Sequence, residues 1–329
     1  MNAIQIERFG GPAELRLADV PKPQPGPDEV LVKLAYAGVN YIDVYMRDGS
    51  YARSNTYQTP LPMTIGMEGA GTVAQVGAGV AGFTAGEPVA YCLCRGSYAE
   101  FAVVPSWKLV PVPPDIDLRI ATTLMLQGST AHYLARSAFP LRSGCTCLVH
   151  AGAGGVGQLL IQLAKLAGTT VITTVGCEEK AELARRRGAD HTVLYRTVDF
   201  AQEVKRITDS KGVDVVYDSV GKDTLMRSLR CLKRRGLCVS FGASSGQPEP
   251  VALLDLAEAG SVFLTRPHLA DYMATADEIR ERAAELFRDH RTSRLEVAID
   301  TEFPLAEAAA AHRAIEARAT RGKLLLKVA

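Results

Sequence analysis

The sequence predicts an α/β protein in which a doubly wound parallel sheet of the Rossmann type is joined to a smaller, β-rich domain. Three observations lead to this prediction. A glycine-rich turn, Gly152 to Gly157, stands between an apolar run and an amphipathic helix. Strand and helix patterns alternate between residues 145 and 265, and short β-type runs separated by Gly and Pro fill residues 1–120. A chain of 329 residues is also long enough for two domains.

The first 120 residues have the pattern of a small barrel-like β domain. Their β-type runs are short, and turn signals recur about every ten residues, as such domains require. The predicted strands cover residues 2–7, 15–19, 29–38, 69–76, 88–91, 98–104 and 108–111.

Helical periodicity over residues 117–136 is predicted to carry the chain into the second domain. A strand begins at Cys147, and the alternation that follows is typical of a parallel sheet. Further strands are predicted at 170–175, 191–195, 213–217, 236–241 and 261–265, with helices at 158–168, 178–187, 200–208 and 223–232. Helices at 273–291 and 305–319 and a strand at 323–328 complete the chain. We therefore expect one domain from residues 1–121 and 265–329, and a dinucleotide-binding domain from residues 122–264.

The glycine turn predicts a dinucleotide site. Gly152, Gly154 and Gly157 fit G-x-G-x-x-G, in which backbone N–H groups and a helix N-terminus receive a pyrophosphate. The first glycine permits the tight turn, the second lets the phosphate approach, and the third lets helix and strand pack closely. With 29 glycines the spacing can arise by chance, and an ordinary turn that binds nothing is the alternative. The strand at 170–175 favours the site, because it completes a β-turn-α-β unit of about 30 residues.

The end of the second strand favours NADPH over NADH. NAD-selective folds place a carboxylate there for the ribose 2′-hydroxyl, whereas this strand ends Val175-Gly176-Cys177. Lys180 follows, and Tyr195-Arg196 ends the third strand on the same side. A cation and a phenol suit a 2′-phosphate. Glu178 and Glu179 argue against it unless they face solvent in the first turn of their helix.

Two further segments are expected near the nicotinamide end. Residues 216–221 and 240–246 place small and hydroxyl side chains at the carboxyl ends of strands, where doubly wound sheets bind ligands. The alternative is that these are ordinary strand-to-helix turns.

Composition excludes several classes of function. The formal net charge is +1, with 37 basic and 36 acidic residues, so there is no basic surface to favour nucleic acid. The first residues lack the order of a signal peptide, and no apolar run reaches membrane-spanning length. Seven cysteines, an odd number, fit reduced packing residues. Cys92 and Cys94 are the only pair that could indicate a metal, but their C-x-C spacing, with both on one face of a strand, favours packing. We expect a cytoplasmic protein without membrane or nucleic-acid partners.

Residues 36–51 concentrate polar aromatic side chains. Four tyrosines, Tyr36, Tyr41, Tyr45 and Tyr51, surround Asn40 at the end of a strand and along a short helix. Such a group can line a site for a flat apolar ligand. The alternative is that some of them, Tyr36 and Tyr41 above all, pack the domain.

With these pieces placed, the chain resembles the zinc-independent quinone oxidoreductases, the zeta-crystallin-like branch of the medium-chain dehydrogenase/reductase superfamily. The resemblance runs nearly end to end. It rests on Ala37-Gly-Val-Asn-Tyr-Ile-Asp43, on the glycine turn with its helix up to Lys165, and on Tyr217-Asp-Ser-Val-Gly221. Further matching segments are residues 241–246, 265–267 and 316–323.

The resemblance implies a GroES-like β-barrel catalytic domain, a site between that domain and the Rossmann domain, and a homodimer formed along the cofactor domains. It implies that Tyr45 and Tyr51 face the quinone and that Asn40 and Thr130 lie near the nicotinamide. It also assigns the cofactor to Gly154, Gly155, Val156, Gly157, Lys180, Tyr195, Ser219, Phe241, Gly242, Ala243, Ser244, Thr265, Arg266, Pro267 and Arg318.

Zinc-containing relatives have Cys where this chain has Asn40, and His where it has Met67. Neither replacement is a competent zinc ligand, so we expect no metal and no Lewis-acid mechanism. Relatives often have lysine where Gln127 stands, which puts any ligand contact from that position in doubt.

The predicted function is hydride transfer from NADPH to a quinone, with Asn40, Tyr45 or Tyr51 orienting the acceptor by hydrogen bonds. The nearest alternative is an enone or enoyl-thioester reductase, in which Tyr45 or Tyr51 is a required proton donor. A third possibility, an RNA-binding or structural zeta-crystallin-like role, conflicts with the balanced charge.

Overall fold

The computed structural model describes residues 1–328, and the chain folds into two compact units. Unit 1 holds Met1–Ser129, Met273–Arg291 and Val297–Ala329; unit 2 holds Thr130–Tyr272 and Thr292–Glu296. The chain leaves unit 1 after residue 129 and returns to it at 273, each eight residues later than the positions 121 and 265 expected from sequence. The predicted boundaries themselves remain a proposal.

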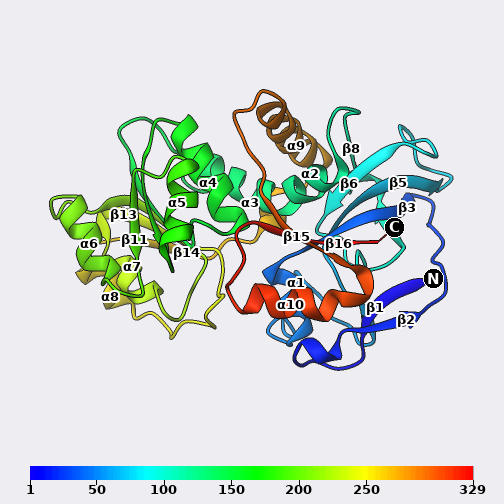
Figure 1. Cartoon of the computed structure of the whole chain (residues 1–329), viewed down its shortest axis with the longest axis horizontal. Coiled ribbons are helices and arrows are strands. Elements are labelled where there is room, and N and C mark those ends of the chain that lie inside the picture. The colour runs from blue at the N-terminus through cyan, green and yellow to red at the C-terminus, as the bar shows by residue number, and fades with distance from the viewer. Residues whose placement is uncertain (329) are drawn as a thin grey trace. The chain divides into compact units, whose positions relative to one another are not determined.

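Unit 2 is built on a six-stranded sheet in which every pairing is parallel. The strands are β9 (Thr146–His150), β10 (Thr170–Val175), β11 (His191–Leu194), β12 (Val213–Asp218), β13 (Leu232–Ser240) and β14 (Phe263–Thr265). Their order is β11-β10-β9-β12-β13-β14, which reverses direction at β9. This is the doubly wound Rossmann arrangement that the sequence predicts, and Figure 1 shows its strands and helices together.

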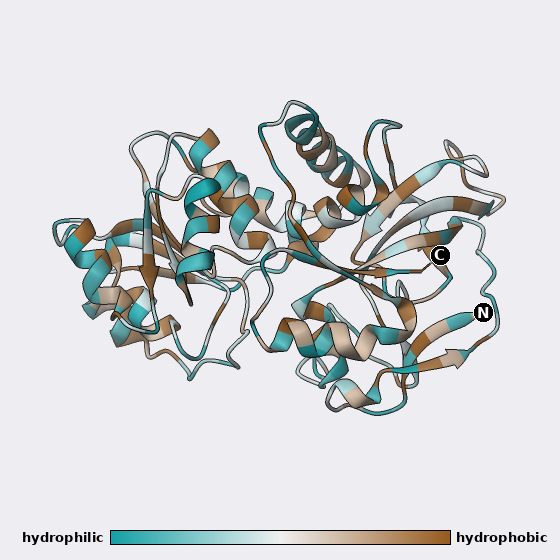
Figure 2. Cartoon of the chain, viewed as in Figure 1, coloured by the Kyte–Doolittle hydropathy of each residue, from teal (hydrophilic) through white to brown (hydrophobic). Residues whose placement is uncertain are grey.

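In unit 2 the helix α3 precedes the first strand, and the other helices each follow a strand. The helices are α3 (Ser129–Tyr133), α4 (Gly155–Leu166), α5 (Glu178–Arg186), α6 (Phe200–Ile207), α7 (Leu225–Leu229) and α8 (Leu253–Glu258). Apolar strand residues such as Leu148, Ile172 and Val216 are buried together with Phe200 and Leu229 in a single core. The colours of Figure 2 show hydrophilic residues on the outward face of α5 and hydrophobic residues along the central strands.

Unit 1 is the β-rich unit. A seven-stranded sheet contains β3 (Glu29–Val39), β5 (Glu68–Val76), β6 (Pro88–Cys92), β7 (Phe101–Pro105), β8 (Val110–Pro111), β15 (Ile299–Pro304) and β16 (Lys323–Lys327). A smaller sheet pairs β1 (Asn2–Ile6) with β2 (Arg16–Asp19) and β4 (Met63–Thr64). The helices are α1 (Tyr41–Arg47), α2 (Leu118–Thr123), α9 (Ala276–Arg291) and α10 (Ala308–Glu316).

Several elements differ from the sequence predictions. The helix predicted over 117–136 is interrupted by two wide π-helical turns, Leu124–Gly128 and Leu134–Ala138. The predicted helix 223–232 is short, because β13 begins at Leu232. Sequence analysis also missed α8 and β15. The strand β15 alternates weakly in polarity and is largely exposed, so it carries little signal of its own; its parallel pairing with β16 defines it.

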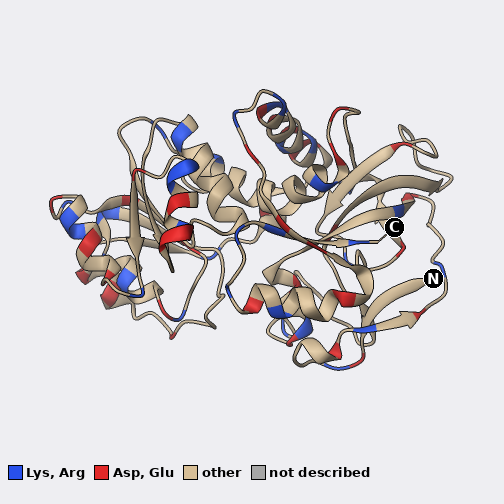
Figure 3. Ribbon diagram, in the orientation of Figure 1, with Lys and Arg blue, Asp and Glu red and all other residues tan. Residues whose placement is uncertain are grey.

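Among residues 1–328 no helix is long and apolar enough to cross a membrane. Figure 3 shows residues of both charges on α5 and α9, and in each helix acidic residues lie in the first turn and basic residues in the last.

Candidate active site

The predicted cofactor residues of unit 2 gather at one edge of its sheet. Because all six strands are parallel, their carboxyl ends lie at the same edge. The glycine turn follows β9, Lys180 follows β10, Tyr195 follows β11, and Ser219 follows β12. Residues 241–244 follow β13, and residues 265–267 end β14 and continue beyond it.

The three glycines of the turn differ in the space around them. A Cβ on Gly157 would lie 2.4 Å from the carbonyl oxygen of Ala151, and one on Gly152 would lie 2.0 Å from Oγ1 of Thr173. A Cβ on Gly154 would meet only the Ala151 oxygen, at 3.2 Å. Gly152 and Gly157 therefore serve close packing, whereas Gly154 leaves the start of α4 open to a phosphate group.

The turns after β12 and β13 are tied to each other. The backbone N–H groups of Phe241 and Gly242 donate to the carbonyl oxygen of Asp218, and that of Ser244 donates to the carbonyl of Ser219. Arg266 donates from Nη1 to the carbonyl of Ser240 at 3.1 Å. The residues expected at the nicotinamide end thus form one hydrogen-bonded surface.

The end of β10 has the environment expected for a 2′-phosphate. Gly176 lies next to both side chains that end β11: its Cβ position is 3.2 Å from the Tyr195 hydroxyl and 3.4 Å from Nε of Arg196. Glu178, which argued against NADPH, is an exposed residue whose carboxylate accepts a 2.7 Å bond from Arg185. Arg196 is a cation that the sequence prediction did not assign to the site, although it adjoins Tyr195 in sequence.

The predicted substrate residues lie in unit 1, on α1 and the loop after it. Tyr41, Tyr45, Tyr51 and Tyr57 form a row, with successive ring centroids 6.0, 5.3 and 5.3 Å apart. Tyr51 and Tyr57 are nearly parallel, at 15°. The Tyr41 hydroxyl donates to the carbonyl of Ile315 at 3.0 Å, which gives it a packing role. Sequence analysis did not single out Tyr57.

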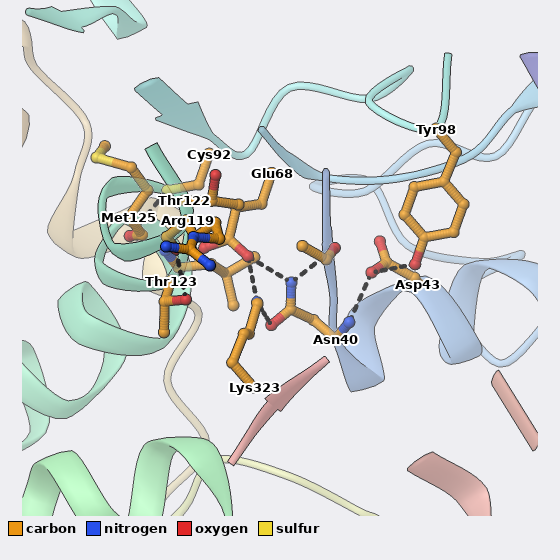
Figure 4. A network of polar contacts seen from close by, with 12 residues as sticks. Asn40, Asp43, Glu68, Cys92, Tyr98, Arg119, Thr122, Thr123, Met125 and Lys323 are labelled. Carbon is orange, nitrogen blue, oxygen red and sulfur yellow. Dashed lines mark hydrogen bonds and ion pairs between the residues drawn. The ribbon is translucent and has the colours of Figure 1, made fainter. Parts of the chain in front are cut away.

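Asn40 is at the centre of a buried polar network, shown in Figure 4. Its Nδ2 donates to Glu68 Oε2 at 2.9 Å and to the carbonyl of Gly38 at 3.3 Å. Its Oδ1 accepts from the Lys323 ammonium at 2.8 Å. An ammonium group has no acceptor, so the atom facing it must be the amide oxygen. Both amide hydrogens of Asn40 are therefore committed within the protein.

Glu68 and Lys323 form an ion pair with no solvent exposure. The second carboxylate oxygen of Glu68 accepts from the backbone N–H of Leu126 at 2.6 Å. In a regular α-helix that N–H would donate to the carbonyl four residues earlier, and the wide turn Leu124–Gly128 presents it to Glu68 instead. Burial raises the pKa of Glu68, and the contact with Lys323 opposes this.

A second chain of hydrogen bonds starts at Asp43. Its Oδ2 accepts from the backbone N–H of Asn40 at 2.8 Å, as the third residue of a capping box does, and from the Tyr98 hydroxyl at 3.2 Å. Tyr98 lies 3.1 Å from Nε2 of His312, whose Nδ1 lies 3.0 Å from Nη1 of Arg47. A guanidinium only donates, so Nδ1 accepts and Nε2 carries the ring proton. Arg47 also binds both oxygens of Glu316.

Both networks hold the same face of α1. Asn40, Asp43 and Arg47 are spaced as one side of a helix, while Tyr41 and Tyr45 are four residues apart on another. The polar face fastens α1 to β5, β16 and α10, and the other carries the tyrosines. Sequence reasoning missed Glu68, Lys323, Tyr98, His312, Arg47 and Glu316 as contributors, because their partners are distant in sequence.

The predicted zinc-ligand positions hold Asn40 and Met67, both buried. Across residues 1–328 no group of three or more His, Cys, Asp or Glu side chains is arranged to hold a metal ion. Gln127 lies in the wide turn beside Leu126, and no described residue forms a hydrogen bond with its Oε1.

Comparison with known proteins identifies the family. The family described as "Alcohol dehydrogenase GroES-like domain" matches residues 26–114, and that described as "Zinc-binding dehydrogenase" matches residues 155–288. A quinone oxidoreductase of Pseudomonas aeruginosa is 43% identical, with 98% of each chain covered. The chain belongs to the zinc-independent quinone oxidoreductases of the medium-chain dehydrogenase/reductase superfamily.

Two other proteins are similar to this chain over their whole length. A 2-haloacrylate reductase of Burkholderia is 43% identical, with 98% of each chain covered. The quinone oxidoreductase of Escherichia coli, solved in complex with NADPH, matches with a TM-score of 0.96 at 38% identity, with 100% of each chain covered. The family and the fold class predicted from sequence are thereby confirmed. The roles of the individual site residues remain predictions.

The Asp43–Tyr98–His312 chain predicts two opposite effects of pH on stability. Burial raises the pKa of Asp43 from 3.8 to about 7, and burial with the nearby Arg47 lowers the pKa of His312 from 6.5 to about 3. Between pH 4 and 6.5 the folded state thus holds one more proton on Asp43 and one fewer on His312 than the unfolded chain. Asp43 makes stability fall as pH rises, and His312 makes it rise, each by about 1.4 kcal/mol per pH unit at most.

Single variants should separate these two effects. Asp43→Asn removes the contribution that falls as pH rises. The free energy of unfolding of this variant minus that of the unchanged protein should therefore increase from pH 4.5 to pH 6.5. His312→Gln removes the contribution that rises with pH, so the same difference for this variant should decrease from pH 4.5 to pH 6.5. Urea unfolding at both pH values measures each difference. Slopes of the same sign in the two variants would contradict the assigned protonation states.

Proposed function

We propose that this protein is an NADPH-dependent quinone reductase that works without a metal ion. The observation that carries the proposal is the tyrosine row beside Asn40. Asn40 occupies the position at which zinc-containing relatives have a cysteine zinc ligand. The names of the Pseudomonas aeruginosa and Escherichia coli relatives, similar over the whole chain, support the same activity.

NADPH is the proposed cofactor, and the solved complex of the Escherichia coli relative supports it. Gly154 to Gly157 would receive the pyrophosphate on the N-terminus of α4, and Lys180, Tyr195 and Arg196 the 2′-phosphate. Ser219, the 241–244 turn and residues 265–267 would border the nicotinamide ribose and ring. When bound, NADPH supplies a hydride from C4 of its dihydronicotinamide ring. We retain Thr130 and Arg318 as further cofactor contacts.

The tyrosine row suits a flat, electron-poor acceptor. Aromatic rings prefer offset-stacked or tilted contacts with centroids about 4.5–7 Å apart, and the row already has this spacing. Tyr45 and Tyr51 also carry hydroxyls that can donate to a quinone oxygen. Reduced quinone oxygens are stabilised by the aromatic ring, so orientation and hydrogen bonding meet most of the demand on the protein.

Asn40 acts in this proposal by orientation rather than as a donor to the substrate. Its two amide hydrogens are bound by Glu68 and Gly38, and its oxygen by Lys323. Asn40 fixes the first turn of α1, and Tyr45 projects from the same helix. The tyrosine hydroxyls are therefore the donors that we assign to the quinone.

A second candidate function is reduction of an activated alkene. The Burkholderia relative named 2-haloacrylate reductase is as similar to this chain as the Pseudomonas aeruginosa quinone oxidoreductase, at 43% identity. Such a reaction needs a proton at carbon after hydride attack, and Tyr45 or Tyr51 would have to supply it.

Replacing the tyrosines separates the two functions. NADPH oxidation by the unchanged protein should be faster with quinones than with enones or 2-haloacrylates. Tyr45→Phe and Tyr51→Phe should each keep quinone turnover within about tenfold, because they remove one hydrogen bond but keep the ring. Tyr36→Phe, outside the row, is the control. The proposal fails if alkenes are the faster substrates and their reduction falls at least ~100-fold in either variant, as loss of a general acid predicts.

The 2′-phosphate assignment has its own test. Lys180→Ala should raise the dissociation constant of NADPH about tenfold, since one charge-assisted bond to phosphate is lost, and leave that of NADH unchanged. Lys211→Ala removes an exposed lysine near the amino end of β12 and serves as the control. Fluorescence titration of the bound dihydronicotinamide measures both constants. Equal affinity for NADH and NADPH in the unchanged protein would refute the assignment.

We also propose a homodimer formed along the cofactor units. Leu253, Leu254 and Phe263 are exposed by 84%, 68% and 61%, although all three are large hydrophobic residues. Phe263 belongs to β14, the last strand in the sheet order, whose outer edge pairs with no strand within residues 1–328. An exposed apolar edge strand favours pairing with a second copy across a twofold axis.

Sedimentation velocity tests the dimer. The unchanged protein should sediment as a species of twice the single-chain mass of 35.3 kDa. In Phe263→Lys the mass of the sedimenting species should shift toward that of a single chain. Trp107→Lys, at an exposed tryptophan of unit 1, should leave the dimer intact. A single-chain mass for the unchanged protein would rule the proposal out.

A cytoplasmic location and the absence of nucleic-acid binding complete the proposal. All seven cysteines are free thiols, which fits a reducing compartment. The near-zero net charge gives no support to an RNA-binding role.

A further inference from the structure

A buried histidine lies directly behind the cofactor-binding edge of unit 2. His150 is the last residue of β9 and immediately precedes the glycine turn; its exposure is 1%. Its Nδ1 lies 2.8 Å from Oγ1 of Thr174 in β10, and its Nε2 lies 3.0 Å from Oγ of Ser228 in α7. The ring of Phe200 packs edge-on against it, with the centroids 4.8 Å apart. Both ring nitrogens are therefore satisfied and the ring is fixed.

Asp218 sets the direction of this chain of hydrogen bonds. Its Oδ2 accepts from the Ser228 hydroxyl at 2.8 Å, which uses the only hydrogen on that oxygen. Ser228 can then only accept from His150, so Nε2 carries the ring proton. Burial lowers the pKa of His150, which keeps the ring neutral and leaves Nδ1 as an acceptor for the Thr174 hydroxyl. The order of donation is Thr174, His150, Ser228, Asp218.

The same four residues hold the turns that we assign to NADPH. Asp218 Oδ1 accepts from the backbone N–H groups of Val220 and Gly221, and its carbonyl accepts from Phe241 and Gly242. The carbonyl of Thr174 accepts from the backbone N–H of Gly152 at 3.2 Å. One end of the chain is thus bonded to the glycine turn, and the other to the turns at 219–221 and 241–245.

We propose that Thr174, His150, Ser228 and Asp218 are positioning residues that set the spacing between the phosphate-binding turn and the turns at the nicotinamide end of the site. None of them is assigned a contact with the cofactor. The proposal rests on the placement of NADPH at this edge. According to this proposal, these four hydrogen-bonded residues affect the affinity for NADPH as well as the stability of the core.

One substitution should reverse the direction of donation along these hydrogen bonds without breaking them. In Asp218→Asn the amide oxygen can keep the three donors at Oδ1, which are the N–H groups of Val220 and Gly221 and the Thr224 hydroxyl. The amide nitrogen then donates to Ser228. Ser228 then donates to Nε2 of His150, and Nδ1 donates to Thr174. We expect the ¹⁵N chemical shifts of His150 to report an Nε2–H tautomer in the unchanged protein and an Nδ1–H tautomer in Asp218→Asn, assigned with His150→Gln. NADPH affinity in Asp218→Asn should stay within about threefold, since no bond is lost.

A second substitution should break the chain. Ser228→Ala leaves the Nε2–H of His150 and Oδ2 of Asp218 without partners, and NADPH affinity should fall about tenfold. Thr169→Ala is the matched control. It removes another fully buried hydroxyl, bonded to the carbonyl of Arg142 near the start of β10, and should lower stability but leave NADPH affinity unchanged.

These measurements have clear contrary outcomes. An Nδ1–H tautomer in the unchanged protein overturns the direction of the chain. If Ser228→Ala lowers stability but binds NADPH normally, the residues are structural and the proposal fails. Lys180→Ala shows whether NADPH is placed correctly. If NADPH affinity falls in Lys180→Ala but not in Ser228→Ala, only the positioning role is refuted. If it falls in neither Lys180→Ala nor Ser228→Ala, the placement of NADPH at this edge is refuted. If Ser228→Ala does not fold, Thr174→Val, which removes the hydroxyl that donates to Nδ1 of His150, replaces it in the same affinity measurement.

Discussion

The buried ion pair of Glu68 and Lys323 is the constraint on which the arrangement of unit 1 depends. Neither side chain is exposed, and a charge in such a place is tolerated only with complete partners. The partners come from Asn40 and from the backbone N–H of Leu126, so α1 and the wide turn at 124–128 must stay where they are. Gly38 is required for the same reason, because a Cβ there would lie 1.9 Å from the Glu68 carboxylate.

Each unit orients a neutral histidine through a group that can only donate or only accept. In unit 2 the carboxylate of Asp218 fixes the donors up to Thr174. In unit 1 the guanidinium of Arg47 makes Nδ1 of His312 an acceptor, so Nε2 donates to the Tyr98 hydroxyl and that hydroxyl donates to Asp43. Groups that can only donate or only accept remove the ambiguity of hydroxyl and imidazole hydrogens. The result in each case is a set of buried polar atoms with one consistent arrangement, which holds the neighbouring backbone rigidly.

The sequence predicted those features whose signals are local. The glycine turn, the alternating elements of unit 2 and the carboxyl-edge position of Lys180 and Tyr195 follow from patterns within about 30 residues. The α1 network could not be found this way, because Asn40 meets Glu68 and Lys323, 28 and 283 positions away. The exposed strand β15 and the wide turns at 124–128 and 134–138 were missed since hydrophobic periodicity does not distinguish them from a loop or a regular helix.

The contacts of Asn40 also change which side chains can act on a substrate. A sequence alone suggests Asn40, Tyr45 and Tyr51 as equivalent hydrogen-bond donors around a quinone. Because the amide hydrogens of Asn40 are already bound, donating to a ligand would leave a buried Glu68 oxygen or the Gly38 carbonyl short of a partner, at a cost of about 1–3 kcal/mol. We therefore propose that Asn40 fixes the helix and that Tyr45 and Tyr51 meet the acceptor.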